Sequence, residues 1–304
     1  MTRLRGRVLR TPLRHSVWLS RASGATVFLK LETLQPTHSY KIRGATNAVR
    51  KMAEGPGPYP PLVTASAGNH GRAMAHAAAD AGMGLTVYVP QHAPRAKIDP
   101  IRELGAELRP CRDYDEAERR AREHGASGSG VYISPYGHPD VIAGAGTVGL
   151  EILEDDERID TIVASIGGGG LISGIGIAAE GRASVMGVEV AASTPFTSSF
   201  AAGRLVEIAV GDSLADGLTG NLDPESPTLD LVRRHVERIA VMSEDELRAA
   251  VRDVFEHERL IIEGATAAAV AALSTRKLDV RNRRVAVVLS GANIDAGKLL
   301  SLLR

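Results

Sequence analysis

The sequence is poor in cysteine, in aromatic side chains and in long apolar runs. Its 304 residues include one cysteine, Cys111, and only 4% aromatic residues. A single cysteine forms neither an intrachain disulfide nor a multi-thiolate metal site, so a reducing, cytoplasmic location is expected. The longest mainly apolar run, residues 265–273, is much shorter than the ~18 residues of a membrane-spanning helix, and no signal-peptide pattern is found. We therefore expect neither a membrane protein nor a disulfide-rich secreted one.

Net charge is absent as well. The 36 Lys+Arg residues balance 36 Asp+Glu residues, which removes the electrostatic argument for binding nucleic acid or an acidic membrane. Residues 1–16 carry five arginines and no acidic residue, but interleaved leucines and a valine indicate an ordered segment with solvated charges. Of the basic residues, 30 are arginine and 6 are lysine, so a lysine inside a motif is a notable candidate.

The residues that are present alternate between two patterns. The chain is 44% hydrophobic and long enough for about two domains. Apolar, β-branched runs predict strands, and runs with helical spacing lie between them. Strands are predicted at 26–32, 62–66, 85–90, 108–111, 131–134, 161–166, 185–190 and 284–290, and helices at 39–54, 70–82, 94–106 (interrupted at Pro100), 115–125, 140–155, 171–181, 243–258 and 263–275. This alternation predicts an α/β fold of two doubly wound domains with mostly parallel sheets.

Two local signals support individual helices, and one excludes regular structure. Ser39 stands in the capping position of its helix, and Ser243 with Glu246 forms a capping box. The prolines and glycines of residues 54–61 break both helix and strand, so that segment is a loop.

Four segments just after a predicted strand hold the candidate chemistry: residues 39–41, 66–71, 167–170 and 290–293. Residues 167–170 are four consecutive glycines between a strand and a helix. Their backbone N–H groups and the start of the helix would converge on one anion, with no Cβ to obstruct it. Phosphate is the obvious ligand. A tight turn that binds nothing is the alternative, but four glycines carry an entropic cost that a plain turn does not need.

Two nucleotide-binding motifs fit this region poorly. Gly174, Gly176 and Ala179 form a GxGxxA match, and Glu189 ends the following strand where a ribose-binding acid would stand. However, both glycines fall inside the predicted helix rather than on its first turn, so the match to a dinucleotide site is weak. No Gly-Lys-Ser/Thr follows the glycines, which excludes a P-loop.

Lys41 indicates a different phosphate ligand. The positive end of a helix dipole disfavours a protonated amine, so a lysine at a helix start reaches its neutral, nucleophilic form more easily. Such an amine condenses with carbonyls, including the aldehyde of pyridoxal phosphate. Taken alone, a lysine at this position is more often a solvated surface residue.

Four segments together resemble a known family. SYKIRGATNAV (39–49), TASAGNHGRAMAHAA (64–78), SIGGGGLISGI (165–175) and SGANID (290–295) look, in order and spacing, like the signature segments of the fold type II, tryptophan-synthase-like, pyridoxal-phosphate enzymes. The serine/threonine dehydratase and serine racemase branch is the most similar, and the resemblance extends over essentially the whole chain. It implies a large cofactor-binding domain of residues 1–44 and 146–304, a small inserted domain of residues 45–145, and a homodimer.

The resemblance also implies roles for individual residues. Lys41 would bond covalently to the cofactor and later carry the Cα proton, and Asn69 would hydrogen-bond the phenolic oxygen. Ser290 would face the pyridine nitrogen, where a neutral hydroxyl leaves that nitrogen largely unprotonated. Gly217 would lie against the ring. The phosphate would be held by Gly167, Gly168, Gly169, Gly170 and Leu171, and the substrate carboxylate by Ser66, Ala67, Gly68 and His70.

Ala67 distinguishes reactions within the family. The related serine racemases carry a serine at this position as a second acid/base, and a methyl group exchanges no proton. Ala67 therefore favours a one-faced reaction, in which a lyase eliminates water from a 3-hydroxy amino acid such as threonine or serine and releases a 2-oxo acid and ammonia. The alternatives are an amino-acid racemase, a dehydratase for another hydroxy amino acid (hydroxyaspartate, phenylserine or a hydroxyectoine breakdown intermediate) and, more distantly, a nicotinamide-dependent oxidoreductase.

Several residues depart from the family pattern. His38 replaces a glycine, Tyr40 a phenylalanine and Ala292 a glycine. The first two add polar groups near Lys41 and point either to a different substrate or to neutral variation. The divalent-cation site of the racemase-like members uses a glutamate, matched by Glu189, and an aspartate six residues later, where Pro195 stands. We expect that site to be absent or altered, and no other metal-ligand spacing is found.

Overall fold

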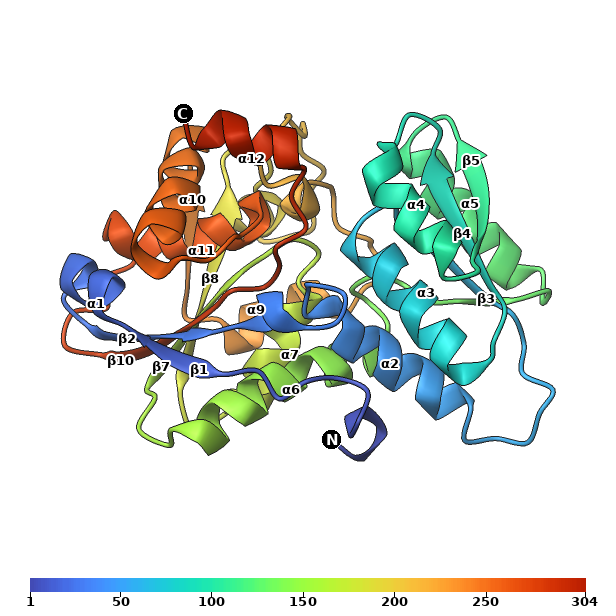
Figure 1. Cartoon of the computed structure of the whole chain (residues 1–304), viewed down its shortest axis with the longest axis horizontal. Helices are drawn as coiled ribbons and strands as arrows, with labels where there is room; N and C mark the ends of the chain where they lie inside the picture. The colour runs from blue at the N-terminus through green and yellow to red at the C-terminus, as the bar shows by residue number, and fades with distance from the viewer. The chain divides into compact units, whose positions relative to one another are not determined.

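The computed structural model describes residues 1–304 and divides into two compact units. Unit 1 comprises Met1–Leu9 and Gln35–Ala145, and unit 2 comprises Arg10–Leu34 and Gly146–Arg304. Figure 1 shows the elements of each unit. No helix is both long and apolar enough to cross a membrane.

This division and the one expected from the sequence share the boundary after Ala145. They differ near the N-terminus, where residues 1–9 and 35–44 group with unit 1. The reason is the packing of α2 (Lys41–Met52), which lies along α3 (Asn69–Ala81) and against the short turn η1 (Thr2–Leu4).

Unit 1 is built around a wholly parallel four-stranded sheet in the order β5-β4-β3-β6. Helices α2 and α3 share one buried cluster with β3 and β4, while Ala117 and Ala121 of α5 pack with Val63, Ala65 and Tyr88 in another. The sheet therefore has helices on both faces. The strands are β3 (Leu62–Ala65), β4 (Leu85–Pro90), β5 (Glu107–Cys111) and β6 (Val131–Tyr132), and the remaining helices are α4 (Arg95–Glu103) and α5 (Tyr114–Ala126).

Unit 2 contains a six-stranded sheet in the order β1-β2-β10-β7-β8-β9. Only β1 runs antiparallel to its neighbour, so the sheet is mostly parallel. In register, Val287 of β10 lies between Leu29 of β2 and Val163 of β7. The strands are β1 (Leu13–Ser16), β2 (Thr26–Lys30), β7 (Thr161–Ser165), β8 (Ser184–Val190), β9 (Arg238–Met242) and β10 (Arg284–Val288).

Helices cover both faces of this sheet as well. Figure 1 shows α1, α10 and α11 on one face and α7, with the unit 2 part of α6, on the other. Glycines permit the close approach of α6 to α7, since a Cβ on Gly146 would stand 2.6 Å from the carbonyl oxygen of Gly174. The helices and turns are α1 (Val17–Ser23), η2 (Glu32–Leu34), α6 (Pro139–Asp155), α7 (Gly170–Ala179), α8 (Pro195–Ala202), η3 (Asp216–Leu218), α9 (Thr228–His235), α10 (Glu244–Glu258), α11 (Gly264–Ser274) and α12 (Ala296–Leu302).

The structure confirms the α/β class, the doubly wound parallel sheets and the capping box of Ser243 and Glu246. Two local expectations are wrong. Pro100 does not interrupt its helix, because α4 runs through it from Arg95 to Glu103. Ser39 is not the N-cap of α2, because Tyr40 takes that place with helical backbone angles. Strands β1 and β9 and helices α1, α8, α9 and α12 were not expected from the sequence.

The N-terminal arginines are paired rather than merely solvated. Arg3 and Arg7 bind Glu54 and Asp80 within unit 1, and Arg14 binds Glu258 within unit 2.

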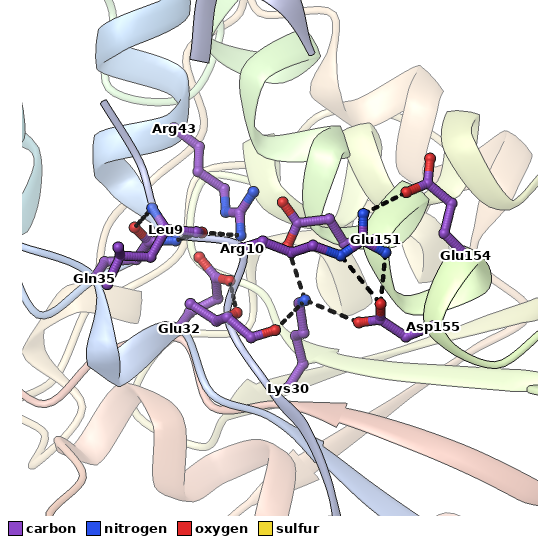
Figure 2. Close-up of polar contacts among 10 residues, drawn as sticks. Leu9, Arg10, Lys30, Glu32, Gln35, Arg43, Glu151, Glu154 and Asp155 are labelled. Carbon is purple, nitrogen blue, oxygen red and sulfur yellow. Dashed lines mark hydrogen bonds and ion pairs between the residues drawn. The ribbon is translucent and has the colours of Figure 1, made fainter. Parts of the chain in front are cut away.

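A buried lysine lies at the end of β2. Lys30 is 0% exposed, and its Nζ lies 2.8 Å from Oε2 of Glu151 and 3.6 Å from Oδ2 of Asp155 (Figure 2). It also donates to the carbonyl oxygen of Thr11 at 2.7 Å. Arg10 contacts Asp155 from the other side at 2.5 Å. This network ties β2 to α6 by charge rather than by apolar packing.

Candidate active site

Lys41 opens helix α2 and carries its amine to the edge of the unit 1 sheet. Its Nζ donates to the carbonyl oxygen of Pro135 at 2.6 Å, and Pro135 follows β6. Ser39 still contributes, since its Oγ accepts the backbone N–H of Lys41 at 3.3 Å. The Tyr40 ring centroid lies 5.4 Å from Nζ, so the polar residue noted in the sequence does stand beside the amine.

His38 has a different explanation. Its φ is +56°, in the left-handed region that favours glycine, and its side chain is exposed. A glycine would adopt this backbone conformation without strain, whereas the Cβ of His38 makes it strained.

The segment 66–71, here called the Ser66 turn, connects β3 to α3. Asn69 is the first residue of α3, the N-cap is Gly68, and no side chain caps the helix. The N–H groups of its first turn have no partners within the helix, as is usual for a helix start. The turn is tight, because a Cβ on Gly71 would stand 2.1 Å from the carbonyl oxygen of Ser66. Ser66 Oγ accepts the N–H of Gly68 at 3.2 Å, which fixes the turn locally.

His70 is buried and uncharged. Its Nε2 lies 3.1 Å from Oγ1 of Thr64, which donates its proton to the carbonyl oxygen of Ile133 at 2.8 Å. His70 therefore donates from Nε2, and its Nδ1 is a buried acceptor with no hydrogen-bond partner. Burial, followed by the nearby Lys41 charge, lowers the pKa of His70 to about 3.

Unit 1 thus brings several predicted residues to one edge. The Ser66 turn follows β3, and the carbonyl that holds Lys41 follows β6. Strands β3 and β6 are parallel neighbours, so their carboxyl ends meet at this edge. Lys41, Asn69 and the Ser66 turn are grouped here, and Ala67 packs against the adjacent apolar cluster.

Residues 167–170, the glycine loop, connect β7 to α7 in unit 2. Gly169 is the N-cap of α7 with φ +86°, and no side chain caps the helix. A Cβ on Gly169 would stand 2.7 Å from Cζ of Phe196 and 2.9 Å from Cβ of Thr228. A glycine is required here both by backbone conformation and by space. With Leu171 in its first turn, α7 presents unfilled N–H groups as an anion cradle.

Gly217 and Ser290 lie near this loop within unit 2. A Cβ on Gly167 would stand 2.9 Å from the carbonyl oxygen of Gly217, so the two backbones are in close contact. The segment before Gly217 is held by Glu244, which accepts from Ser213 Oγ at 2.5 Å and from the N–H of Leu214 at 2.8 Å.

Ser290 follows β10, the neighbour of β7, so it shares the carboxyl-end edge with the glycine loop. Helix α7, which follows β7, and α11, which precedes β10, lie on opposite faces of the sheet (Figure 1), and α/β sheets bind ligands outside the carboxyl ends of their strands.

Sequence reasoning missed Thr266. This residue of α11 is 0% exposed, and its Oγ1 lies 3.0 Å from Oγ of Ser290. In the sequence, the feature that could have identified Thr266 is a hydroxyl residue inside an otherwise apolar, alanine-rich helix.

Two other sequence expectations are settled by packing. Gly174 and Gly176 lie inside α7, where they serve helix contacts: a Cβ on Gly176 would stand 2.6 Å from Cβ of His235. They form no phosphate-binding turn. Glu189 is buried and caps α8, accepting the N–H of Phe196 at 2.8 Å and the N–H of Thr197 at 2.9 Å, and Pro195 is the first residue of that helix. Burial raises the pKa of Glu189, because desolvation outweighs these hydrogen bonds.

The residues fit pyridoxal phosphate. Unit 2 offers the N–H groups at the start of α7 for its phosphate, at a turn where Gly169 has no room for a side chain beside Phe196 and Thr228, together with a hydroxyl, Ser290, on the adjoining strand end. Unit 1 offers an amine, Lys41, that donates to the carbonyl oxygen of Pro135.

Comparison with known proteins gives the same result. A family model described as "Pyridoxal-phosphate dependent enzyme" matches residues 4–291. The L-threonine ammonia-lyase of Thermotoga maritima is 37% identical over 300 residues, which cover 97% of this chain and 74% of that relative.

Solved structures agree with this assignment. The processed form of threonine deaminase isoform 2 from Solanum lycopersicum has a TM-score of 0.88 and 29% identity, covering 97% of this chain and 87% of that one. A pyridoxal 5'-phosphate-dependent aspartate racemase has a TM-score of 0.90 and 30% identity, covering 98% and 94%. The chain belongs to the family of pyridoxal-phosphate dependent enzymes, as a lyase whose cofactor is pyridoxal 5'-phosphate.

Proposed function

We propose that this enzyme eliminates water from a 3-hydroxy amino acid, L-threonine or L-serine first among them, and that hydrolysis of the resulting enamine returns that water and releases a 2-oxo acid and ammonia. The observation that carries the proposal is the pairing of one nucleophilic lysine, Lys41, with a methyl group at Ala67. The similar L-threonine ammonia-lyase and threonine deaminase support the reaction type.

When bound, the cofactor supplies an electron sink for the Cα carbanion. Lys41 would hold the cofactor through its Nζ, and the same amine would act as the general base for the Cα proton of the substrate. Its position at the start of α2 makes the amine easier to deprotonate, and the hydrogen bond from Nζ to the Pro135 carbonyl oxygen orients it. Lys41 works from one face only, since Ala67 has no exchangeable proton.

The Ser66 turn receives the substrate carboxylate. Backbone N–H groups of Ala67 and the first turn of α3, with the hydroxyl of Ser66, supply the donors, while the N–H of Gly68 bonds to Ser66 Oγ and holds the turn in place. His70 contributes shape and polarity without a positive charge, because its pKa lies near 3. Asn69 hydrogen-bonds the phenolic oxygen of the cofactor.

Unit 2 residues orient the remaining groups of the cofactor. The N–H groups of Gly167, Gly168, Gly169, Gly170 and Leu171 bind its phosphate. Ser290 meets the ring nitrogen, and Gly217 leaves space for the ring. We assign no metal ion to the reaction, since the oxygens of Glu189 are used by the start of α8.

The alternatives differ at defined positions. A racemase for serine or another amino acid needs a second acid/base on the opposite face, where Ala67 offers none. A dehydratase for hydroxyaspartate, phenylserine or a hydroxyectoine breakdown intermediate would use the same machinery with a different side-chain pocket. If the wild-type enzyme forms no 2-oxo acid from any of these substrates, the proposal is rejected.

The test is a matched set of variants. Wild-type protein should show visible absorbance that borohydride removes and should release a 2-oxo acid from L-threonine or L-serine. Lys41→Ala should lack both, and Lys51→Ala, an exposed lysine of the same helix paired with Asp140, should keep both. Ala67→Ser should gain exchange of Cα stereochemistry. Racemisation by the wild-type protein without 2-oxo acid release would favour the racemase instead.

We also propose a cytoplasmic homodimer. The buried, free Cys111 suits a reducing compartment. Light scattering of the purified holoenzyme measures the subunit number directly.

A further inference from the structure

Thr266 lies at the centre of a small hydroxyl network in unit 2. Its Oγ1 accepts the N–H of Gly291 at 2.8 Å and donates to the carbonyl oxygen of the same residue at 2.8 Å. The Oγ of Ser290 lies 3.0 Å away, and either hydroxyl can be the donor. Thr266 is 0% and Ser290 5% exposed, so water does not replace these partners freely.

The number of protons limits how this network can be arranged. A hydroxyl has one proton and two acceptor positions. The N–H of Gly291 only donates, so one acceptor position of Thr266 is always used. The Thr266 proton goes either to the carbonyl oxygen of Gly291 or to Ser290.

Rotation of the Thr266 hydroxyl toward Ser290 costs little free energy, because the oxygen that it leaves has a second donor. The carbonyl oxygen of Gly291 also accepts the N–H of Glu263 at 3.1 Å. When the Thr266 proton turns to Ser290, this oxygen keeps a partner, and no buried group is orphaned.

With the Thr266 hydroxyl rotated in this way, the hydrogen bonds form a chain in which each group donates to the next. The N–H of Gly291 donates to Thr266, Thr266 donates to Ser290, and the proton of Ser290 is left for a partner beyond the network. Each bond in such a chain polarises the next and strengthens the final donor. A neutral ring nitrogen accepts this proton, whereas a protonated one cannot.

We propose that Thr266 is a positioning residue that aims the Ser290 proton at the ring nitrogen of the cofactor and thereby keeps that nitrogen unprotonated. The inference rests on the proposed role of Ser290. Without the Thr266 hydroxyl, the Ser290 hydroxyl can rotate and accept a hydrogen bond from a protonated ring nitrogen. The ring nitrogen therefore takes up a proton more readily.

Charged groups near the network act on the same nitrogen and need a separate control. Glu263 is the nearest, since a Cβ on Gly291 would stand 2.5 Å from its Oε1, and its Oε2 accepts the N–H of Asn293 at 3.1 Å. Lys30, at the end of the neighbouring β2, is engaged by Glu151, and Asp216 of η3, which packs against α11, is exposed. Glu263→Gln, alone and combined with Thr266→Val, separates carboxylate charge from hydroxyl direction.

The experiment uses holoenzyme loaded with pyridoxal phosphate that carries ¹⁵N in the ring. The nitrogen chemical shift is followed by NMR against pH. Wild-type enzyme should keep the unprotonated shift, and Thr266→Val should raise the pKa of the ring nitrogen by about 0.5–1 unit. Cofactor dissociation constants should rise about 2- to 10-fold in the same variant. Thr266→Ser, which keeps the hydroxyl, should restore both values.

A matched control is available at the opposite end of the same helix, where Thr275 is the C-cap of α11. Thr275 also donates a hydroxyl hydrogen bond, to the carbonyl oxygen of Ala271 at 2.7 Å. Thr275→Val should leave the ring nitrogen shift unchanged. If Thr266→Val does not fold, Thr266→Cys retains a weak S–H donor and should give an intermediate shift. In a Ser290→Ala background, removal of the Thr266 hydroxyl should have no further effect.

The outcomes separate this inference from the proposed function. An unchanged ring nitrogen pKa in Thr266→Val holoenzyme that is still bonded through Lys41 overturns the role of Thr266 alone. Wild-type protein that binds no pyridoxal phosphate through Lys41 overturns the proposed site instead. An equal pKa change in the Ser290→Ala background shows that Thr266 acts by another route and also overturns the inference.

Discussion

Replacing Lys30 with methionine removes the cation from a buried ion pair with Glu151. The Lys30 side chain is 0% exposed and that of Glu151 is 4% exposed, with 2.8 Å between Nζ and Oε2. Asp155 is less dependent on Lys30, because it is 26% exposed and also binds Arg10 at 2.5 Å. The main cost of the substitution is therefore the loss of the cation beside the buried carboxylate of Glu151.

Breaking a buried ion pair by removing one partner costs about 3–5 kcal/mol, and the support that Asp155 retains favours a loss near 3 kcal/mol. Lys277 provides the matched control in the same unit. It lies 2.7 Å from Oε2 of Glu246 and donates to the carbonyl oxygen of Val241 at 3.0 Å, but its side chain is 43% exposed. Lys277→Met should cost about 0.2–1 kcal/mol.

The assay is urea unfolding followed by tryptophan fluorescence. The single tryptophan, Trp18, belongs to unit 2, so the signal reports the unit that contains both lysines. Lys30→Met combined with Glu151→Leu should recover more than half of the loss, because the buried charge that has lost its cation is removed with it. A Lys30→Met loss no larger than that of Lys277→Met would refute the reasoning.

Three further outcomes are expected. His38→Gly should raise the unfolding free energy by about 1 kcal/mol in a thermal melt, because φ is +56° there, and an unchanged or lower melting temperature would contradict this strain. His70→Asn should flatten the acid side of the stability profile: the pKa of His70 is lowered from 6.5 to about 3, so the unfolded chain takes up a proton first and wild-type stability falls as pH drops through this window. Gly169→Ala should weaken cofactor binding by at least about tenfold, through strain at φ +86° and the contact with Phe196, whereas Gly203→Ala, at φ +67° with open space, carries only the strain. Equal cofactor titrations of these two glycine variants would show that the space around Gly169 is not needed.

Much of this site was predictable because its chemistry is local in the sequence. The glycine loop needs no distant residue to reveal an anion cradle, since consecutive glycines at a strand-to-helix turn already imply exposed N–H groups. Lys41 was recognisable only because its segment and three others together resemble a known family, since a lysine at a helix start is by itself more often a surface residue. The exact cap was not, because Ser39 and Tyr40 are both compatible with that turn and only the backbone angles decide between them.

The rest depended on tertiary contacts. Nothing near Thr266 in the sequence indicates a serine 24 positions away, and the pair meets only because α11 packs beside β10. The same holds for Lys30, whose partners lie on α6. Edge strand β1 escaped prediction because Arg14 and His15 interrupt its apolar pattern. Strand β9 has four consecutive apolar residues after Arg238, so its signal was present in the sequence and was missed.

The position of β10 in the larger sheet has a consequence for the order of events during synthesis. This strand lies between β2 and β7, yet it is the last strand that the ribosome makes. The strands of unit 1 are all translated well before β10. Strand β2, in contrast, cannot pair with β10 until residue 288 has emerged from the ribosome. Nascent chains should therefore carry a finished smaller sheet beside an open larger one, and the unpaired edges of β2 and β7 are where chaperones would be needed.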